Sequence, residues 1–385
     1  MIQREWKKIG IVFVSAGLLL ACSTGGDEST VTPRQPADEA GTNRRAMLTN
    51  IADNIILPSY ANFKTTFDAM LVKSDAFAAK PSPASLTEFR QAWATAYTNW
   101  QKVELFDVGP AEQHTLRNFF NIYPANVSGI EANIVTGSSA PLDIPAAYPK
   151  QGFPAIDYLI NGSGTTDGAI LAQYTTSADA GKRIAYLKRI TDQMNTVFTT
   201  VYGEWTGGYR DTFVNCTSLD AGCSTSKLVN GYVMHYERYI RAGKIGIPSG
   251  AMTNGTPAPD KVEALYTPGL SLTLAKTAHQ AAIDFFNGKS VKTGQEGPGF
   301  KTYLNGLGAR EGRTGAALVD LVNTQFDMAN KQLNTLNGNL STGVKTNNAA
   351  VAQVYTEMQK VVRMLKVDMT AAMSITITYT DNDGD

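Results

Sequence analysis

Residues 85–104, SLTEFRQAWATAYTNWQKVE, decide the fold of this chain. Their aromatic side chains recur at spacings of three and four residues and so share one face of a helix: Phe89, Trp93, Tyr97 and Trp100. Ser85 and Glu88 have the spacing of a capping box, in which two side chains satisfy the first free N–H groups of a helix. The segment therefore predicts an amphipathic helix that begins at Ser85 and carries Glu104 on its apolar face.

The same helical period recurs over most of the remaining chain. Further apolar stripes begin near these residues: Leu48, Leu187, Val229, Leu274, Leu318 and Val351. Ile375–Tyr379 instead alternates and is β-branched, which favours a short strand or an extended tail. The irregular stretches 106–153 and 246–270 predict long ordered loops. We expect an all-α fold of two packed helical bundle domains, with long ordered loops and a short extended C-terminal tail.

The N-terminus has the pattern of a bacterial lipoprotein signal. A basic start and the short apolar run 9–20 lead into Leu-Leu-Ala-Cys, which ends at Cys22. That run is shorter than the ~20 residues that a spanning helix needs, so we expect the signal to be removed and Cys22 to carry a lipid. Ser23 is not the acidic residue typical of retention at the inner membrane, which favours the outer membrane, on its periplasmic side or at the cell surface. The alternative is an ordinary secretory signal with a chance cysteine.

The chain is expected to divide into five segments. These are a lipoprotein signal peptide (1–21), a flexible polar tether (22–43), an N-terminal helical half (44–205), a loop with a disulfide (206–225), and a C-terminal helical half with an acidic tail (226–385). Cys216 and Cys223 enclose turn-forming residues and would lie in an oxidising compartment, which predicts that they form the disulfide. A metal pair is the alternative, but no second cysteine pair is present to complete a zinc site.

Charge and motifs exclude several classes of function. Lys and Arg number 34, as do Asp and Glu, so no overall positive field exists that would attract nucleic acid. The sequence contains no phosphate-binding loop, no nucleophile elbow and no pair of histidines at helical ligand spacing. We therefore assign no catalytic residue.

Several blocks of the sequence resemble the imelysin family, also called peptidase family M75. They are Trp93 with 104–111 (ELFDVGPA), 152–159 (GFPAIDYL), the segment from Glu237 through 244–248 (KIGIP), 262–264 (VEA), and Ser271-Leu272. The resemblance covers nearly all of the chain after the tether, as an order of segments more than as identity. It implies a helical envelope protein related to a periplasmic component of bacterial iron uptake.

The family's signature is Gly-x-His-x-x-Glu followed by an aromatic residue, and this chain departs from it. Pro154 stands where the family has His, and Asp157 stands where it has Glu. A His and a Glu three residues apart on a helix can share one metal ion, but proline has no side-chain ligand to offer. The departure argues against a metallopeptidase mechanism and against metal binding by this pair.

Eight residues are candidates to line a cleft between the two halves. They are Glu104, Arg117, Asp157, Tyr158, Glu237, Arg241, Glu263 and Ser271. Glu263 and Ser271 are included because of the resemblance, and Glu237 and Arg241 because their spacing suits an ion pair along a helix. Glu104 is equally compatible with a solvated helix end, and Asp157 with a helix cap or a partner of Arg117.

The acidic end of the chain gives a second candidate for cation binding. Asp381, Asp383 and Asp385 alternate with Asn and Gly, as at the start of a calcium loop, but the distal glutamate of such a loop is missing. A solvated acidic tail is the alternative. Iron or calcium are therefore the cofactors to consider, without a definite assignment of either.

We expect a lipid-anchored envelope protein that binds rather than catalyses. Its partners would be the outer membrane through the lipid, and an iron species or an envelope uptake protein. One alternative is a surface metallopeptidase of the M75 type. The other is a structural or adhesion lipoprotein that binds a protein partner.

Overall fold

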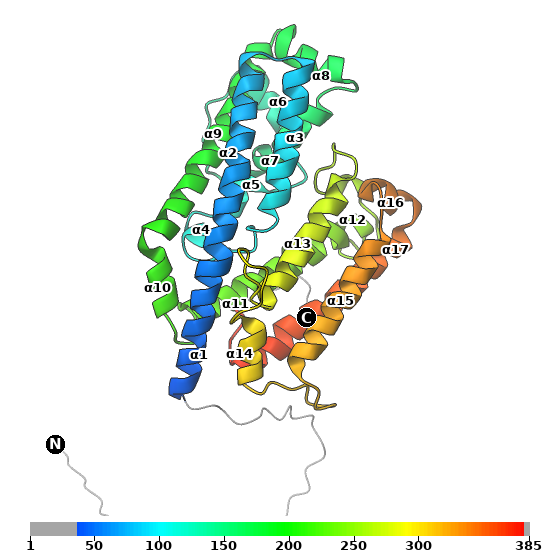
Figure 1. Cartoon of the computed structure of the whole chain (residues 1–385). Helices are drawn as coiled ribbons and strands as arrows, with labels where there is room; N and C mark the ends of the chain where they lie inside the picture. The colour runs from blue at the N-terminus through cyan, green and yellow to red at the C-terminus, as the bar shows by residue number, and fades with distance from the viewer. Residues whose placement is uncertain (1–36, 381–385) are drawn as a thin grey trace, which may run out of the picture. The chain divides into compact units, whose positions relative to one another are not determined.

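The computed structural model describes residues 37–380, with side chains from residue 43 on, and these residues belong to the compact unit Thr32–Asp385. Within 37–380 the chain is mainly helical and forms no strand, which confirms the all-α prediction (Figure 1). No helix in this range has the length and apolar character needed to cross a membrane. The predicted anchor Cys22 and the acidic residues Asp381, Asp383 and Asp385 lie outside the described residues.

The first half is built on a long antiparallel hairpin. Its first arm runs through α1 (Ala37–Asn50), the π-helical η1 (Ile51–Ile56) and α2 (Leu57–Ala79), and its second arm is α3 (Pro83–Trp100). The long helix α9 (Ala180–Glu204) packs against α2 (Figure 1). Pro58 occupies the first turn of α2, where a missing N–H is tolerated.

The two stretches expected to be irregular contain short helices. In the stretch 106–153 these are α4 (Pro110–Gln113), α5 (Leu116–Phe120), α6 (Val127–Thr136), η2 (Tyr148–Lys150) and the start of α7 (Gly152–Asp157). The chain then continues through η3 (Tyr158–Gly162) and α8 (Asp167–Thr175) to α9. In the second stretch they are α12 (Ile247–Ser249) and η6 (Pro259–Lys261). Most of these elements are too short to display a hydrophobic period, so sequence patterns do not reveal them.

The helices that follow α9 make up the second half of the chain and belong to the same compact unit as the first. After η4 (Trp205–Tyr209) and α10 (Arg210–Asn215), the second half comprises α11 (Ser224–Met234), η5 (His235–Gly246), α13 (Leu270–Phe286), α14 (Phe300–Gly306), α15 (Leu318–Thr335), α16 (Leu340–Thr346), α17 (Asn348–Arg363), η7 (Met364–Met369) and α18 (Thr370–Met373). The helix α13 contacts η5 and α15 within this set, and α3 in the first half. The helix α13 therefore connects the two halves where it packs against α3.

The helix α3 begins two residues before the predicted start, and its cap lies three residues before the predicted cap. The helix begins at Pro83 with Ser82 as its cap, and the capping box is formed by Ser82 and Ser85 rather than by Ser85 and Glu88. Pro83 favours the first helical position because its fixed φ suits a helix and its missing N–H costs nothing there. The predicted apolar face is otherwise present, since its four aromatic side chains are buried.

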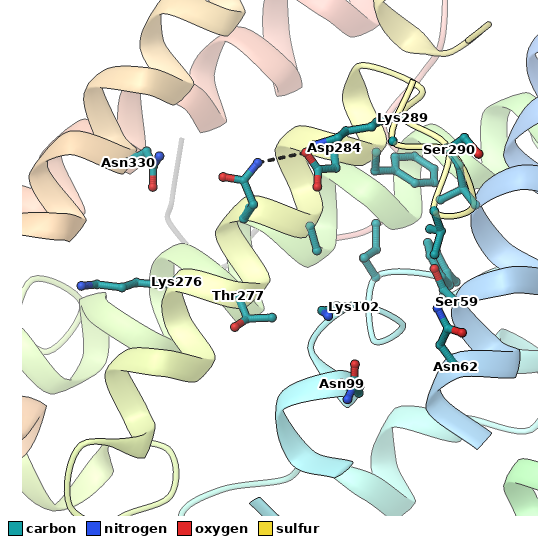
Figure 2. Close-up of a pocket in the computed structure, with 18 of the residues that line it drawn as sticks. Ser59, Asn62, Asn99, Lys102, Lys276, Thr277, Asp284, Lys289, Ser290 and Asn330 are labelled. Atoms are coloured by element: carbon teal, nitrogen blue, oxygen red, sulfur yellow. Dashed lines mark hydrogen bonds and ion pairs between the residues drawn. The ribbon is translucent and has the colours of Figure 1, made fainter. Parts of the chain in front are cut away.

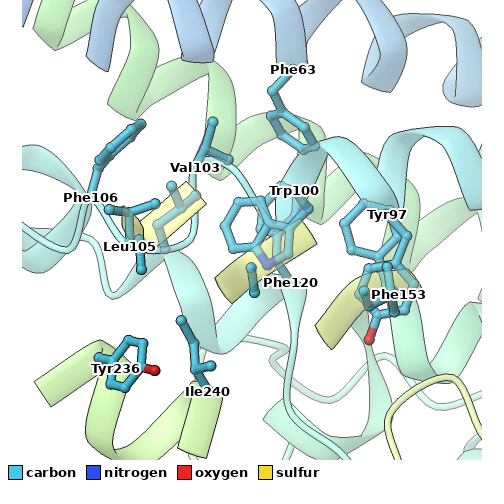
Figure 3. Close-up of a cluster of buried hydrophobic side chains, with 14 of the residues drawn as sticks. Phe63, Tyr97, Trp100, Val103, Leu105, Phe106, Phe120, Phe153, Tyr236 and Ile240 are labelled. Carbon is cyan, nitrogen blue, oxygen red and sulfur yellow. The ribbon is translucent and has the colours of Figure 1, made fainter. Parts of the chain in front are cut away.

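Aromatic side chains from both halves fill the core. Figure 3 shows Trp100 against Phe120 and Tyr97 against Phe153, and these pairs stack with ring centroids 4.4 and 4.5 Å apart. Such pairs contribute roughly 0.5–1.5 kcal/mol beyond their buried area. The stacks fix the C-terminal half of α3 against α5 and α7, and α3 carries polar residues of the candidate site at its end.

Two loops of the same design flank α14: the first turn loop (289–296) and the second turn loop (310–317). Each is closed by one antiparallel bridge between its end residues. In each, the second side chain accepts hydrogen bonds from two backbone N–H groups, and the sixth residue is a glycine with positive φ: Ser290 and Gly294 in the first, Glu311 and Gly315 in the second. The positive φ of about 70° at both glycines is the reason that glycine is suited to this position.

Of the two turn loops, only the first is hydrogen-bonded to the π-helical η1 of the first half. The Val291 N–H donates to the carbonyl of Asn54 at 2.8 Å, and Lys292 Nζ donates to the carbonyl of Asp53 at 3.1 Å. In the π-helical pattern of η1, Leu57 donates to the carbonyl of Ala52, and residue 58 would donate to that of Asp53, but Pro58 has no N–H. The carbonyl of Asp53 is thus open to a partner from elsewhere in the chain, and Lys292 of the first turn loop provides one.

The C-terminal tail and the disulfide loop complete the described chain. Cys216 and Cys223 are joined by a disulfide, as their spacing predicted. Residues 375–380 form no strand; they lie against α11, where Asn230 bonds the backbone of Thr376 and Thr378. The predicted boundary between halves at 205–226 remains a prediction.

Candidate functional site

A buried carboxylate cluster lies where α3, α5, η5 and the segment before α13 meet. Its centre is Glu263, whose carboxylate accepts from Lys244 Nζ at 2.5 Å, Asn121 Nδ2 at 2.8 Å and Gln101 Nε2 at 3.0 Å. Lys244 also donates to Gln101 Oε1 at 2.6 Å. All four side chains are buried, so these bonds replace the water that each polar group loses on folding.

Glu104 extends this cluster toward the surface. Its Oε1 accepts from Asn121 Nδ2 at 2.9 Å and lies 3.1 Å from Arg117 Nε, an ion pair without hydrogen-bond alignment. The Arg117 guanidinium also covers the ring of Tyr239, 3.4 Å from its centroid. Glu104 Oε2 has no hydrogen-bond partner among residues 43–380. Two carboxylates therefore face two cations, and the buried carboxylate cluster is matched in charge.

Two tyrosines border the cluster. Burial raises the pKa of Tyr97 well above its usual value, and the nearby Glu263 raises it further. The pKa of Tyr123 is raised by the same causes in the same order. The Tyr97 hydroxyl donates to Asn121 Oδ1 at 2.6 Å, which is consistent with a phenol that keeps its proton.

Asp157 occupies the family's signature position but has no metal-binding geometry. Its Oδ2 accepts from the Tyr266 N–H at 2.9 Å, and its Oδ1 accepts from Thr267 Oγ1 at 2.6 Å and Asn161 Nδ2 at 2.9 Å. Burial raises the pKa of Asp157 to about 6, although these three hydrogen bonds oppose the rise. Pro154 in the same helix has no ligand atom, so the residues present do not fit the metal that a His-x-x-Glu pair would hold.

Backbone geometry explains why glycine stands at position 152, the first position of this motif. Gly152 begins α7 with φ of +77°, and a Cβ there would collide with the carbonyl oxygen of Phe120. Only glycine allows both the positive φ and the close approach of α7 to α5. This part of the signature therefore serves packing, whatever stands at positions 154 and 157.

The remaining predicted residues lie in other clusters. Tyr158 donates to Glu131, which also pairs with Arg183 at 2.7 Å. Glu237 accepts from Lys366 at 3.1 Å and from the Tyr379 hydroxyl at 2.6 Å, and lies 3.9 Å from Arg241 Nη2. Of the eight predicted residues, the structure thus brings together Glu104, Arg117, Glu263 and Ser271, whose hydroxyl bonds the Glu263 carbonyl.

No predicted residue lines the cavity that the structure contains between the two halves. This lysine cavity has a volume of about 610 Å³ and is bounded by α2, the end of α3, α13, the first turn loop and α15. Figure 2 shows the polar face of α13, with Thr277 and Asp284, between Asn330 of α15 and the pair Ser59 and Asn62 of α2. The lysines of its lining are Lys102, Lys276 and Lys289.

The sequence carries one signal that points to this cavity. Residues 276, 277, 280 and 284 recur at helical spacing and form a polar stripe beside the apolar stripe of α13. A polar stripe is ordinarily read as a solvated helix face. Only the packing of α2 and α15 on either side makes it the wall of a cavity.

The described residues contain no ready site for a bare metal ion. No group of three or more His, Cys, Asp or Glu side chains in that part of the chain is arranged to hold one. His235 and His279 are buried, and burial lowers the pKa of both. His114 lies apart from them and pairs with Glu204 at 2.7 Å.

Comparisons with known proteins place this fold. The model of the imelysin (peptidase M75) family matches residues 56–367. "Iron-regulated protein A" of Synechococcus elongatus is 25% identical over 121 residues, which cover 30% of this chain and 33% of that protein. The match thus spans about a third of the relative's length.

Two solved structures have the same fold at low identity. A putative iron-regulated protein A precursor from Parabacteroides distasonis superposes with a TM-score of 0.68 at 17% identity, over 88% of this chain and 96% of that one. An imelysin-like protein from Psychrobacter arcticum gives 0.65 at 16% identity, over 88% and 98%. The match of the family model over most of the chain, together with the helical fold, shows that this protein belongs to the imelysin family.

Proposed function

We propose that this protein is a lipid-anchored, non-enzymatic binding component of the bacterial envelope, linked to the uptake of iron or a related nutrient. The iron link is supported by its relatives, which are named as iron-regulated proteins. The anchor is supported by the sequence that ends at Cys22. The outer membrane, facing the periplasm or the exterior, is the location that this signal favours.

The proposal that the protein is not an enzyme rests on the hydrogen bonds of Asp157. Both of its oxygens accept hydrogen bonds from the protein's own backbone and side chains, and its neighbour Pro154 offers no ligand. A metallopeptidase needs a metal with an open position to activate water. Asp157 instead ties α7 to the segment at 266–267, which is a structural role.

A motif-restoring variant tests this interpretation. The full chain, purified in detergent, is titrated calorimetrically with ferric, ferrous, zinc and calcium ions, and compared with the double variant P154H/D157E. We expect no heat of zinc or iron binding at this motif in the natural chain, and a gain of metal affinity in the double variant if it retains the fold. Thermal unfolding of both proteins checks the fold.

A cleavage assay separates binding from peptidase activity. Unfolded protein substrates are incubated with the full chain, with and without a chelator. Binding predicts no chelator-sensitive cleavage, and the variant D157N should behave identically. Cleavage that the chelator abolishes, and that D157N lacks, would overturn the proposal in favour of a metallopeptidase.

The anchor and the iron link have their own measurements. The variant C22A should move the protein from the membrane fraction to the soluble fraction of the cells that make it. Cells without the protein should accumulate less radiolabelled iron under iron limitation, and the natural chain should restore uptake. Unchanged accumulation, with a stable protein partner recovered by pull-down, would favour a structural or adhesion role.

A further inference from the structure

The lysine cavity carries positive charge that the protein does not neutralise. Its lining has three lysines and one aspartate, a net charge of +2. Asp284 is already engaged by Lys289 Nζ at 3.3 Å and by Gln280 Nε2 at 2.9 Å. Lys276 bonds only the backbone carbonyl of Leu336, at 3.3 Å, and Lys102 has no side-chain partner among residues 43–380. Two ammonium groups thus lack a carboxylate.

The rest of the lining suits a small organic molecule better than an inorganic ion. Neutral hydrogen-bonding groups surround the lysines: Ser59, Asn62, Asn99, Thr277, Asn330 and Asn334. Leu105, Phe106 and Phe285 add an apolar part to the wall, against which a carbon skeleton could pack. A volume of about 610 Å³ also falls within the roughly 300–1,000 Å³ usual for small-molecule sites.

The lining excludes coordination of a bare cation. Asp284 is its single acidic residue, and neither histidine nor cysteine contributes. Hard cations such as iron prefer several carboxylate or other oxygen ligands, and the net charge of +2 on the lining repels them. If iron reaches this cavity, it does so inside an anionic complex whose own oxygens hold the metal.

One wall of the cavity is fixed before any ligand arrives. The first turn loop supplies Lys289, Ser290 and Gly294, and its backbone is held to Asn54 by the Val291 N–H. Asn50 Nδ2 holds the adjacent carbonyls of Gly288 and Pro298, at 3.0 and 2.8 Å. A wall ordered in advance reduces the entropy that a ligand must otherwise lose on binding.

We propose that the lysine cavity binds a small polycarboxylate, either free or as its ferric chelate. The ammonium groups of Lys102 and Lys276 pair with carboxylates, the asparagines and Thr277 bond the remaining oxygens, and the apolar wall contacts the carbon skeleton. The proposal rests on the proposed function for its link to iron. It adds to that function the chemical class of the ligand and the place where it binds.

Calorimetric titration of the full chain in detergent tests the proposal. The probes are citrate, ferric citrate, inorganic phosphate and glucose. Citrate or ferric citrate should bind, with an affinity that falls as salt is added, while glucose and phosphate should bind at least tenfold more weakly. Citrate and ferric citrate without heat above dilution would overturn the proposal, and phosphate that binds as well as citrate would reduce the cavity to an unspecific anion site.

Variants locate the binding. The double variant K102M/K276M should weaken citrate binding by tenfold or more, whereas K331M should not change it, because Lys331 lies on α15 next to the lining residue Asn330 but does not itself line the cavity. Equal citrate affinity in the natural chain and K102M/K276M would contradict the site. Thermal unfolding verifies that both variants fold.

The outcomes remain distinct from those of the proposed function. Chelator-sensitive peptidase activity would overturn the non-enzymatic role without bearing on citrate affinity. Failure of citrate to bind would leave iron accumulation by cells, and therefore the proposed function, untouched.

Discussion

The end of α3 separates two regions with opposite electrostatic designs. Gln101 is fully buried and bonds Lys244 and Glu263, whereas the next residue, Lys102, lines the lysine cavity. In the buried carboxylate cluster every charge has an opposite charge from the same chain. In the lysine cavity two lysines have none. The comparison teaches that burial of charged residues identifies internal supports here, while unmatched charge beside a cavity identifies a place for a ligand.

The largest expected effect comes from removing the cation of the buried carboxylate cluster. In K244M, Glu263 keeps its buried position but loses its ammonium partner, so the variant should lose roughly 3–5 kcal/mol of unfolding free energy. Urea unfolding measures the loss. The double variant K244M/E263Q removes both charges and should recover a large part of it. A single variant within 1 kcal/mol of the natural chain would show that the ion pair is not what supports this region.

The pH dependence of stability provides a second test, at Asp157. Its pKa is about 6 in the folded protein, against an ordinary value of 3.8, so the folded state binds more protons between these values. This contribution to stability is fully present below pH 3.8 and is lost as the pH rises through about 6. The total is about 3 kcal/mol.

The variant D157N isolates this group. The unfolding free energy of the natural chain, less that of D157N, should fall as the pH rises from 3.5 to 7 by about that amount. Because the comparison concerns the slope with pH, any constant cost of the amide cancels. Parallel curves for the two proteins would mean that the pKa of Asp157 is the same in the folded and unfolded proteins, and would contradict the raised value.

The disulfide gives an intermediate effect on stability without an effect on either region. Cys216 and Cys223 are seven residues apart and close a loop that lines neither the cluster nor the cavity. The paired variant C216S/C223S should lose about 2 kcal/mol, as the chain-entropy account gives for so short a loop. Citrate affinity should not change. A change in affinity would indicate that global stability, not local charge, controls the cavity.

The smallest predicted effect concerns the helix that carries both regions. S82A removes the side-chain oxygen that caps the Ser85 N–H, and should cost about 1 kcal/mol. Because the cap lies at the opposite end of α3 from Gln101 and Lys102, citrate binding should be retained. Thermal unfolding and calorimetry on the same sample measure both properties.

Sequence periodicity predicts the helices well and their polar contacts poorly. The aromatic stripe of α3 was predictable because four large side chains repeat with the helical period, although proline at position 83 moved the start to residue 83. Glu104, Arg117 and Glu263 could be singled out, but their meeting depends on elements far apart in the chain. Lys102, Lys276 and Lys289 form no motif at all, because each belongs to a different packing contact.

Pro58 has a consequence that reaches from the first helical arm to the wall of the lysine cavity. The N–H that it lacks leaves the Asp53 carbonyl to Lys292 Nζ, next to the bond from the Val291 N–H to Asn54, so a missing local hydrogen bond is replaced by a long-range attachment. In P58A the helix would regain its own bond, and the carbonyl would be shared between the helix and the loop. The hydrogen bond that completes the helix would then compete with the bonds that hold the first turn loop. The helix would become more regular, and the wall of the cavity would be held less firmly.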